Sequence, residues 1–158
     1  MNVLVFGKDG QLGRAFKSLL DGLPLAKNTV IRYVGRADCD LSDEFALNNL
    51  LEQFAPNLII NAAAYTAVDK AESETTLAYA VNARAPELMA IYAAENKATL
   101  LHYSTDYVFD GIKSTLYFET DKRNPLSIYG KSKAAGEEAI EDVFKQHNTQ
   151  AQFAILRT

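Results

Sequence analysis

The chain has 158 residues, of which 48% are apolar and 23% charged, and this composition suits one globular domain rather than two. Its 20 acidic and 16 basic side chains leave no basic excess for nucleic acid, and no apolar run approaches the ~20 residues of a membrane span. The single cysteine, Cys39, excludes an internal disulfide, and two histidines, His102 and His147, do not suggest a metal cluster, so no bound metal is expected.

The N-terminal segment MNVLVFG lacks the basic and apolar stretches of a signal peptide, and a cytoplasmic location is expected. Beyond it, short apolar runs alternate with longer segments of helical spacing. The apolar runs predict strands at 2–6, 30–34, 58–62, 99–104 and 153–157. The segments between them predict helices over 11–23, 42–54, 75–96 and 129–147. This repeated order predicts an α/β fold, a Rossmann-type doubly wound parallel sheet with helices on both faces.

Two details of the helices follow from single residues. Ser42 precedes Asp43 and Glu44, so it is the expected N-cap of a helix with an acidic first turn. Pro86 lies inside the third helical segment, where a missing N–H is expected to bend the helix or mark a restart.

A glycine-rich turn links the first strand to the first helix. Gly7, Gly10 and Gly13 have the spacing G-x-x-G-x-x-G, which serves a tight turn, close approach of the backbone to a pyrophosphate, and close packing of helix on sheet. The free N–H groups at the helix N-terminus favour an anion. The predicted cofactor-binding residues of this turn are Gly7, Gly10, Gln11, Leu12 and Gly13.

Three further segments are expected to line the same cofactor site. Arg36 follows the second strand, where NAD-selective sites often carry an acid, so it favours the 2′-phosphate of NADPH, with NADH left open and a solvated loop arginine as the alternative. Asp40 and Leu41 are candidates for binding and covering an adenine ring. Ala62, Ala63 and Ala64 would let the backbone lie close to a flat cofactor, although alanines also serve packing alone.

Tyr129 and Lys133 are four residues apart at the predicted start of the last long helix. This separation returns to nearly the same helical face, so the phenol and the ammonium are expected to share one space. A nearby cation favours the phenolate, which would lower the pKa of Tyr129 and suit it to proton donation. From spacing alone, an ordinary aromatic residue and a surface lysine remain the alternative.

Taken together, these residues resemble the short-chain dehydrogenase/reductase superfamily, in its extended branch that acts on nucleotide sugars. The strings GxxGQLG, NAAAYTAVDKAE, STDYVFDG and PLSIYGKSKAAGE are similar to the dTDP-4-dehydrorhamnose reductase family, and the resemblance covers essentially the whole chain. Members of that family continue into a smaller sugar-nucleotide-binding part. The resemblance therefore implies that residues 1–158 form the NAD(P)-binding Rossmann domain with the catalytic residues, without the C-terminal substrate-binding part.

The resemblance also implies roles for individual residues. Tyr129 matches the proton donor to a carbonyl oxygen, and Lys133 matches the lysine that perturbs this tyrosine and binds the nicotinamide ribose. Thr105 matches the hydroxyl residue that holds the carbonyl, and its neighbour Asp106 is a candidate for contact with the sugar. Asn82 is a candidate for ordering the active-site helix, with a capping or packing role near Pro86 as the alternative.

Two other segments are left without a chemical role. Residues 68–72 follow the family pattern, but their charges suit a solvated helix start equally well. Some family members form a magnesium-linked dimer through an acid early in the first helix, where this chain has Arg14, Ala15 and Phe16. A metal-linked dimer is therefore not expected, and a homodimer is left open.

The implied function is the reduction of dTDP-4-dehydro-6-deoxy-L-mannose to dTDP-L-rhamnose by NADPH, with a nucleotide sugar as partner and neither nucleic acid nor membrane. Two alternatives share these motifs. One is a non-catalytic nucleotide-binding regulatory subunit similar to that of methionine adenosyltransferase, and the other is a different nucleotide-sugar epimerase or dehydratase. Intact Thr105, Tyr129 and Lys133 favour an enzyme over the regulatory subunit.

Overall fold

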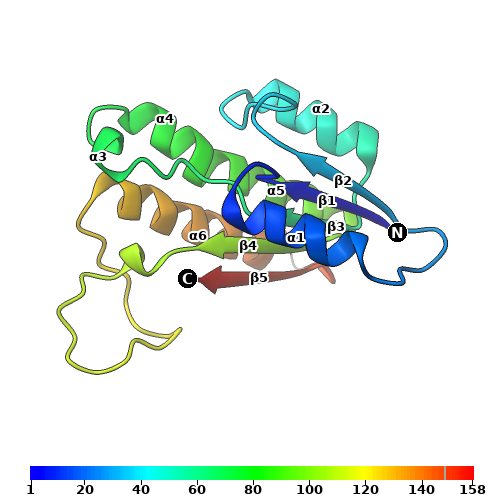
Figure 1. Ribbon diagram of the computed structural model, residues 1–158. Helices are drawn as coiled ribbons and strands as arrows, with labels where there is room; N and C mark the ends of the chain where they lie inside the picture. Colours follow the sequence, from blue (N-terminus) through cyan, green and yellow to red (C-terminus); the bar gives the residue numbers. More distant parts are fainter. Residues whose placement is uncertain (148) are drawn as a thin grey trace.

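Five parallel strands form one sheet in the order β2-β1-β3-β4-β5 in the computed structural model, which describes residues 1–147 and 149–158 (Figure 1). The strands are β1 (Asn2–Phe6), β2 (Val30–Val34), β3 (Leu58–Asn61), β4 (Thr99–Ser104) and β5 (Gln152–Arg157). Because all five run the same way, the turns that follow them meet at one edge of the sheet. The predicted α/β fold with a parallel sheet is confirmed.

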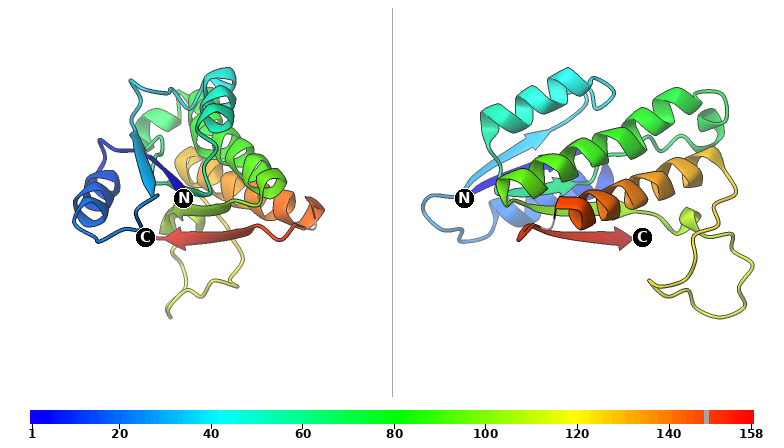
Figure 2. Two further views of the ribbon diagram at one scale, coloured as in Figure 1. Left: turned by 90° about the vertical axis from the view of Figure 1, so that its right-hand side faces the viewer. Right: turned by 180° about the vertical axis from the view of Figure 1, so that it is seen from behind.

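Helices cover both faces of the sheet, but unevenly (Figure 2). Helix α1 (Gln11–Asp21) packs on one face against Val3, Val5 and Ile60. The other face carries α2 (Glu44–Phe54), α5 (Ala85–Asn96) and α6 (Ile128–His147), which pack on Leu4, Phe6, Ile59 and Leu100. The larger core therefore lies between the sheet and α2, α5 and α6.

The predicted helix over 75–96 is continuous but changes pitch. It comprises α4 (Thr75–Tyr79), a π-helical segment η1 (Ala80–Arg84) and α5, which has Pro86 in its first turn. The expectation that Pro86 marks a restart is confirmed, since the proline lacks an N–H where a new helix does not need one. One short helix, α3 (Val68–Ala71), precedes this stretch, in agreement with the helix start that the charges of residues 68–72 suited.

The predicted N-cap of α2 is wrong by one residue. Asp43 is the cap, and its carboxylate accepts a hydrogen bond of 3.0 Å from the N–H of Ala46. The hydroxyl of Ser42 instead donates to Asp40, at 2.7 Å. Ser42 thus braces the turn before the helix, and the acid beside it binds the free N–H groups of the first turn.

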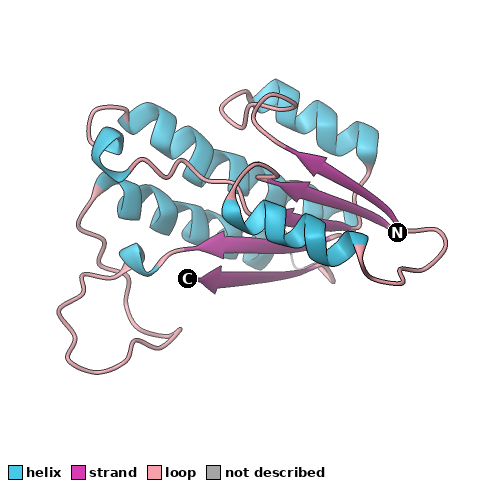
Figure 3. Ribbon diagram, viewed as in Figure 1, coloured by secondary structure: helices cyan, strands magenta, loops and turns pink. Residues whose placement is uncertain are grey.

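A short 3-10 helix, η2 (Asp106–Val108), follows β4. Residues 109–127 then form a long loop that stands away from the sheet before the chain enters α6 (Figure 3). Within the described residues, no helix is both long and apolar enough to cross a membrane.

Candidate functional site

The glycine turn lies at the carboxyl end of β1, where the first helix begins. Gly7 has φ +87°, and its N–H donates to the carbonyl of Val34 at 2.9 Å. A Cβ on Gly7 would lie 2.7 Å from the backbone carbonyl of Ala62. Both the positive φ and this close approach to the end of the neighbouring strand β3 require glycine.

The two later glycines of the turn have different surroundings. A Cβ on Gly13 would lie 2.0 Å from the carbonyl oxygen of Gly7, so Gly13 allows α1 to pack directly on the turn. A Cβ on Gly10 would meet only that same oxygen, at 3.3 Å. Gly10 is also the N-cap of α1 and supplies no side-chain cap, so the N–H groups of the first helical turn lie beside open space.

A pocket of about 560 Å³ opens at this end of the sheet, between the turns that follow β1, β2 and β3. It brings together most of the residues that were predicted to bind a cofactor. Those that line it are Gly7, Gly10, Gln11, Leu12, Arg36, Asp40, Leu41, Ala62, Ala63 and Ala64. Gly13 is buried in α1 behind the turn and is not part of the lining.

Further lining residues were not singled out from the sequence. Five of them lie one or two positions from predicted residues in the sequence: Asp9, Gly35, Cys39, Tyr65 and Thr66. An extension of each predicted motif by one or two positions would have included them. Leu77 and Val81 come from α4 and η1, which cross the end of the sheet. No local signal in the sequence marks these two residues, because their place depends on the packing of α4 and η1.

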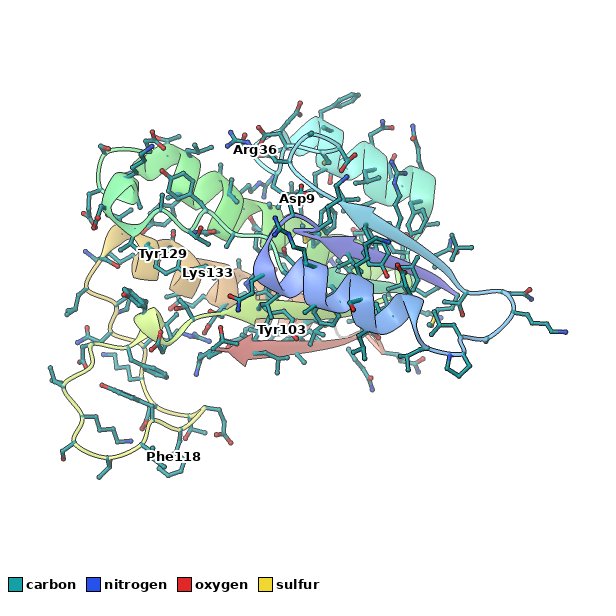
Figure 4. All side chains as sticks on the ribbon, in the orientation of Figure 1. Asp9, Arg36, Tyr103, Phe118, Tyr129 and Lys133 are labelled. Atoms are coloured by element: carbon teal, nitrogen blue, oxygen red, sulfur yellow. The ribbon has the colours of Figure 1, made fainter. Side chains whose placement is uncertain are left out.

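Charged side chains gather at the β2 end of the pocket. The guanidinium of Arg36 is exposed and lies 3.5 Å from the carboxylate of Asp40. Hydrogen bonds from Ser42, together with the charge of Arg36, hold the pKa of Asp40 below its usual value. On the other side of Gly35, the carboxylate of Asp9 packs so closely that a Cβ on Gly35 would lie 2.1 Å from its oxygen. Arg36 and Asp9 therefore frame this end with opposite charges (Figure 4).

Thr105 and Tyr129 come together beside the carboxyl end of β4. Burial raises the pKa of Tyr129, and the nearby hydroxyl of Thr105 opposes that rise. Thr105 in turn accepts from the N–H of Tyr107 at 3.3 Å and donates to Asp106 at 3.2 Å. The ring of Tyr107 packs edge-on against Tyr129, with centroids 5.5 Å apart. Thr105 and Tyr129 therefore lie near each other, and Tyr107 contacts both.

Lys133 lies one turn beyond Tyr129 on α6, as the spacing predicted (Figure 4). Its side chain is buried, and its ammonium donates to the carbonyl of Tyr103 at 2.7 Å. The charge of Lys133 is not among the causes that shift the pKa of Tyr129, and that pKa is raised rather than lowered. The prediction that Lys133 lowers the pKa of Tyr129 is therefore wrong for this structure, because the lysine bonds to β4 instead of the phenol.

The amide of Asn82 fixes α6 to the turn that follows β3. Its oxygen accepts from the N–H of Tyr65 at 2.8 Å, and its nitrogen donates to the carbonyl of Tyr65 and to the hydroxyl of Ser132, both at 3.0 Å. Ser132 lies on α6 between Tyr129 and Lys133. The expected ordering of this helix by Asn82 is confirmed.

Asp106 lies in a second pocket of about 330 Å³, next to the Thr105–Tyr129 pair. Other residues of this pocket come from the long loop and the start of α6. Its lining residues are Asp106, Tyr107, Phe109, Asp110, Gly111, Tyr117, Leu126 and Ser127. Across the described ranges, 1–147 and 149–158, no three His, Cys, Asp or Glu side chains gather as metal ligands would.

Comparison with known proteins places this geometry in a family. The family model described as RmlD substrate binding domain matches residues 1–158. The chain belongs to that family. It is 42% identical over 148 residues to a dTDP-4-dehydrorhamnose reductase of Salmonella typhimurium, a match that covers 93% of this chain and 49% of that protein.

Solved structures agree with this family assignment. A dTDP-4-dehydrorhamnose reductase of Clostridium acetobutylicum superposes with a TM-score of 0.87 at 37% identity, over 99% of this chain and 52% of that one. The enzyme of the same name from Bacillus anthracis, in complex with NADP, gives a TM-score of 0.83 at 33% identity over the same shares. The chain therefore spans about half the length of the relatives that it matches.

Proposed function

We propose that residues 1–158 form the cofactor-binding and catalytic part of an NADPH-dependent reductase that converts dTDP-4-dehydro-6-deoxy-L-mannose (dTDP-4-dehydrorhamnose) to dTDP-L-rhamnose. The observation that carries the proposal is the proximity of Thr105 and Tyr129 after the carboxyl end of β4, at the edge of the sheet where the pocket of the glycine turn also opens. The names of the relatives, at 42% and 37% identity, support the sugar and the reaction.

The residues of the larger pocket fit a dinucleotide. The uncapped N–H groups at the start of α1, beside Gly10, would bind the pyrophosphate, and Gly7 and Gly13 keep the backbone close enough for that contact. Asp40 and Leu41 would bind and cover the adenine ring. Arg36 is exposed and lies 3.5 Å from the carboxylate of Asp40, and it would bind the 2′-phosphate of NADPH. NADH lacks this phosphate and would bind without that contact.

NADPH, when bound, supplies the hydride. The hydroxyl of Thr105 would hold the carbonyl oxygen of the sugar, and the hydroxyl of Tyr129 would donate its proton to that oxygen. The raised pKa of Tyr129 keeps this proton in place at neutral pH until a charge develops on the substrate. Lys133, fixed on the carbonyl of Tyr103, would direct its remaining N–H groups to the nicotinamide ribose. Asp106, in the smaller pocket, would contact the nucleotide sugar.

The same site favours the reductase over the regulatory subunit, but not over an epimerase or dehydratase. A regulatory subunit needs neither hydroxyl, whereas a reductase needs both Thr105 and Tyr129. An epimerase or dehydratase would use the same pair, so the preference over these enzymes rests on the names of the relatives. A cytoplasmic location remains a prediction.

The test uses the whole gene product that contains residues 1–158. Tyr129→Phe should lower the turnover of dTDP-4-dehydrorhamnose by at least ~10²-fold, the usual effect of a positioned general acid, with little change in NADPH affinity. Tyr33→Phe is the matched control, because it also loses one hydroxyl but lies outside both pockets. The rate is followed by the absorbance of NADPH.

Two outcomes would contradict the proposal. Full turnover in Tyr129→Phe would remove the tyrosine from the mechanism. A wild-type protein that oxidises no NADPH but binds a partner enzyme tightly would support the regulatory subunit. The 158-residue chain by itself should bind NADPH yet reduce the sugar poorly, because it spans about half of its relatives, 49% in the Salmonella enzyme.

A further inference from the structure

The position directly after β2 carries no side chain in this protein. Gly35 follows Val34, the last residue of β2, and lines the larger pocket. In NAD-selective sites an acid at the end of this strand accepts a hydrogen bond from the ribose 2′-OH, whereas an arginine nearby accommodates the 2′-phosphate of NADP. The side chains that surround Gly35 therefore decide which of these two groups the pocket favours.

The carboxylate of Asp9 occupies the space that a side chain at position 35 would fill. A Cβ on Gly35 would lie 2.1 Å from Oδ2 of Asp9 and 3.2 Å from its Cγ. Among the glycines of the described chain, positive φ angles occur at Gly7 and Gly111, so the backbone of Gly35 does not itself require glycine. The missing side chain thus leaves room for Asp9, which comes from the turn after β1 (Figure 4).

The turn after β1 does not need the charge of Asp9. It closes with a hydrogen bond of 3.0 Å from the N–H of Gly10 to the carbonyl of Gly7. Across residues 1–147 and 149–158, no hydrogen bond or ion pair engages the carboxylate of Asp9, and α1 begins without a side-chain cap. Asparagine would serve such a turn as well as aspartate does. The free carboxylate is therefore available to a ligand in the pocket.

The cations near Asp9 are paired with other acids. Nζ of Lys8 lies 2.5 Å from Asp38, and Nε of Arg36 lies 3.5 Å from Asp40. The hydrogen bond with Asp38 raises the pKa of Lys8, and the charge of Asp9 adds to that rise. One negative charge remains in excess among these five side chains. A ribose hydroxyl can donate to such a carboxylate, whereas the charge of a phosphate is repelled by it.

We propose that Asp9 is a specificity-determining residue of the cofactor site and replaces the missing acid at the end of β2. Its carboxylate accepts from the ribose 2′-OH of NADH and disfavours the 2′-phosphate of NADPH. The proposal rests on the proposed function in that a dinucleotide occupies the larger pocket. Asp9 and Arg36 act in opposite directions on one position of the cofactor, and their balance sets how strongly NADPH is preferred.

The first test is calorimetry on the whole gene product that contains residues 1–158, with ADP-ribose and 2′-phospho-ADP-ribose as probes. These nucleotides differ only at the 2′ position and lack the nicotinamide, so no hydride transfer contributes. Asp9→Asn keeps the size of the side chain and its turn preference but removes the charge. The affinity for 2′-phospho-ADP-ribose relative to ADP-ribose should rise by at least about tenfold.

A matched control separates a local effect from a change in net charge. Asp142→Asn removes the same charge from an exposed position on α6, outside both pockets. The relative affinity for the two probes should stay at the wild-type value in this variant. An equal rise in Asp142→Asn and Asp9→Asn would show a general charge effect and would contradict the proposal.

A second experiment moves the carboxylate to the end of β2. Asp9→Ala should weaken ADP-ribose by about tenfold, because the acceptor for the 2′-OH is lost. In Asp9→Ala/Gly35→Asp the new side chain enters the space that Asp9 has left, where the nearest remaining atom is Cε of Lys8 at 3.0 Å. The affinity for ADP-ribose should then return close to the wild-type value.

The outcomes separate this proposal from the reductase activity. An unchanged relative affinity in folded Asp9→Asn would overturn the proposal, as would a folded double variant that binds ADP-ribose no better than Asp9→Ala. A wild-type protein that binds neither probe would overturn the proposal and the cofactor site together. Because the probes cannot be reduced, a protein that oxidises no NADPH would contradict the reductase function without affecting these affinities.

Discussion

Gly10 and Gly13 belong to one motif, but the structure predicts opposite effects for their substitution. A Cβ on Gly13 would lie 2.0 Å from the carbonyl oxygen of Gly7 and 2.7 Å from Cα of Lys8. These are backbone atoms that cannot turn aside, so α1 must shift away from the turn. Overpacking of this kind costs about 1–3 kcal/mol, and we expect the upper end for Gly13→Ala.

This loss is measurable as a change in thermal stability. Since the entropy of unfolding is about 2.1 cal/mol/K per residue, a loss of ~3 kcal/mol lowers the Tm of a 158-residue chain by about 9 °C. Gly10→Val should behave differently. Gly10 has φ −79° and ψ 173°, an extended conformation that valine adopts readily, and its Cβ would meet a single atom, at 3.3 Å. The Tm of Gly10→Val should therefore change by less than about 3 °C.

For Gly10→Val, binding of NADPH should be affected more than stability. The side chain of Gly10→Val would occupy the pocket where the pyrophosphate is proposed to approach the backbone. Calorimetry should show a loss of at least ~10²-fold in affinity, or about 2.7 kcal/mol. Gly22→Ala is the control, because its Cβ has no neighbour closer than 3.5 Å and Gly22 lies outside the pocket. Unchanged NADPH affinity in folded Gly10→Val, or an unchanged Tm in Gly13→Ala, would refute the reasoning.

Two further predictions concern charged side chains. Arg36→Ala should weaken NADPH more than NADH, because only NADPH has a 2′-phosphate for the exposed guanidinium, and equal losses in calorimetry would make Arg36 a surface residue. Glu137→Gln should lower the free energy of unfolding by about 3 kcal/mol, because the fully buried carboxylate accepts from Arg157 at 2.7 Å and from Arg123 at 2.5 Å. Burial would raise the pKa of Glu137, but these arginines hold it below its ordinary value of 4.5, so the stabilisation is present above that pH and is lost as the pH falls further. Urea unfolding at pH 7 and at pH 3 should therefore show a smaller difference between wild type and Glu137→Gln at the lower pH.

The sequence predicted those parts of the fold that depend on local patterns. The strands at 2–6, 30–34 and 99–104 were predicted with the bounds that the structure has, because apolar runs between turn residues define them. The cap of α2 was wrong because Ser42 and Asp43 are both good caps, and only the structure shows that Asp40 engages the hydroxyl of Ser42. The segment η1 packs against α6, and no local pattern in the sequence signals its π-helical pitch.

For the site, motif spacing located the residues but not the directions of their side chains. The glycine turn, Arg36 and the alanine run all line one pocket, as expected from turns at the same edge of a parallel sheet. The four-residue spacing also set Tyr129 and Lys133 on one helical face. It could not show that Lys133 bonds to Tyr103, since a lysine side chain is long enough to reach either β4 or the phenol.

The position of Tyr129 is set by three successive buried contacts of α6. Ser132 accepts from Asn82 beside the turn after β3, Lys133 donates to β4, and Glu137 accepts from Arg157 of β5. Each contact joins the helix to a different part of the domain, and each would leave a buried polar group unpaired if the helix slid or rotated. Because an unpaired buried polar group costs about 1–3 kcal/mol, and a charged one more, α6 has one favourable register on the sheet. Tyr129 lies in the first turn of that helix, so the register of α6 also sets the position of the phenol near Thr105.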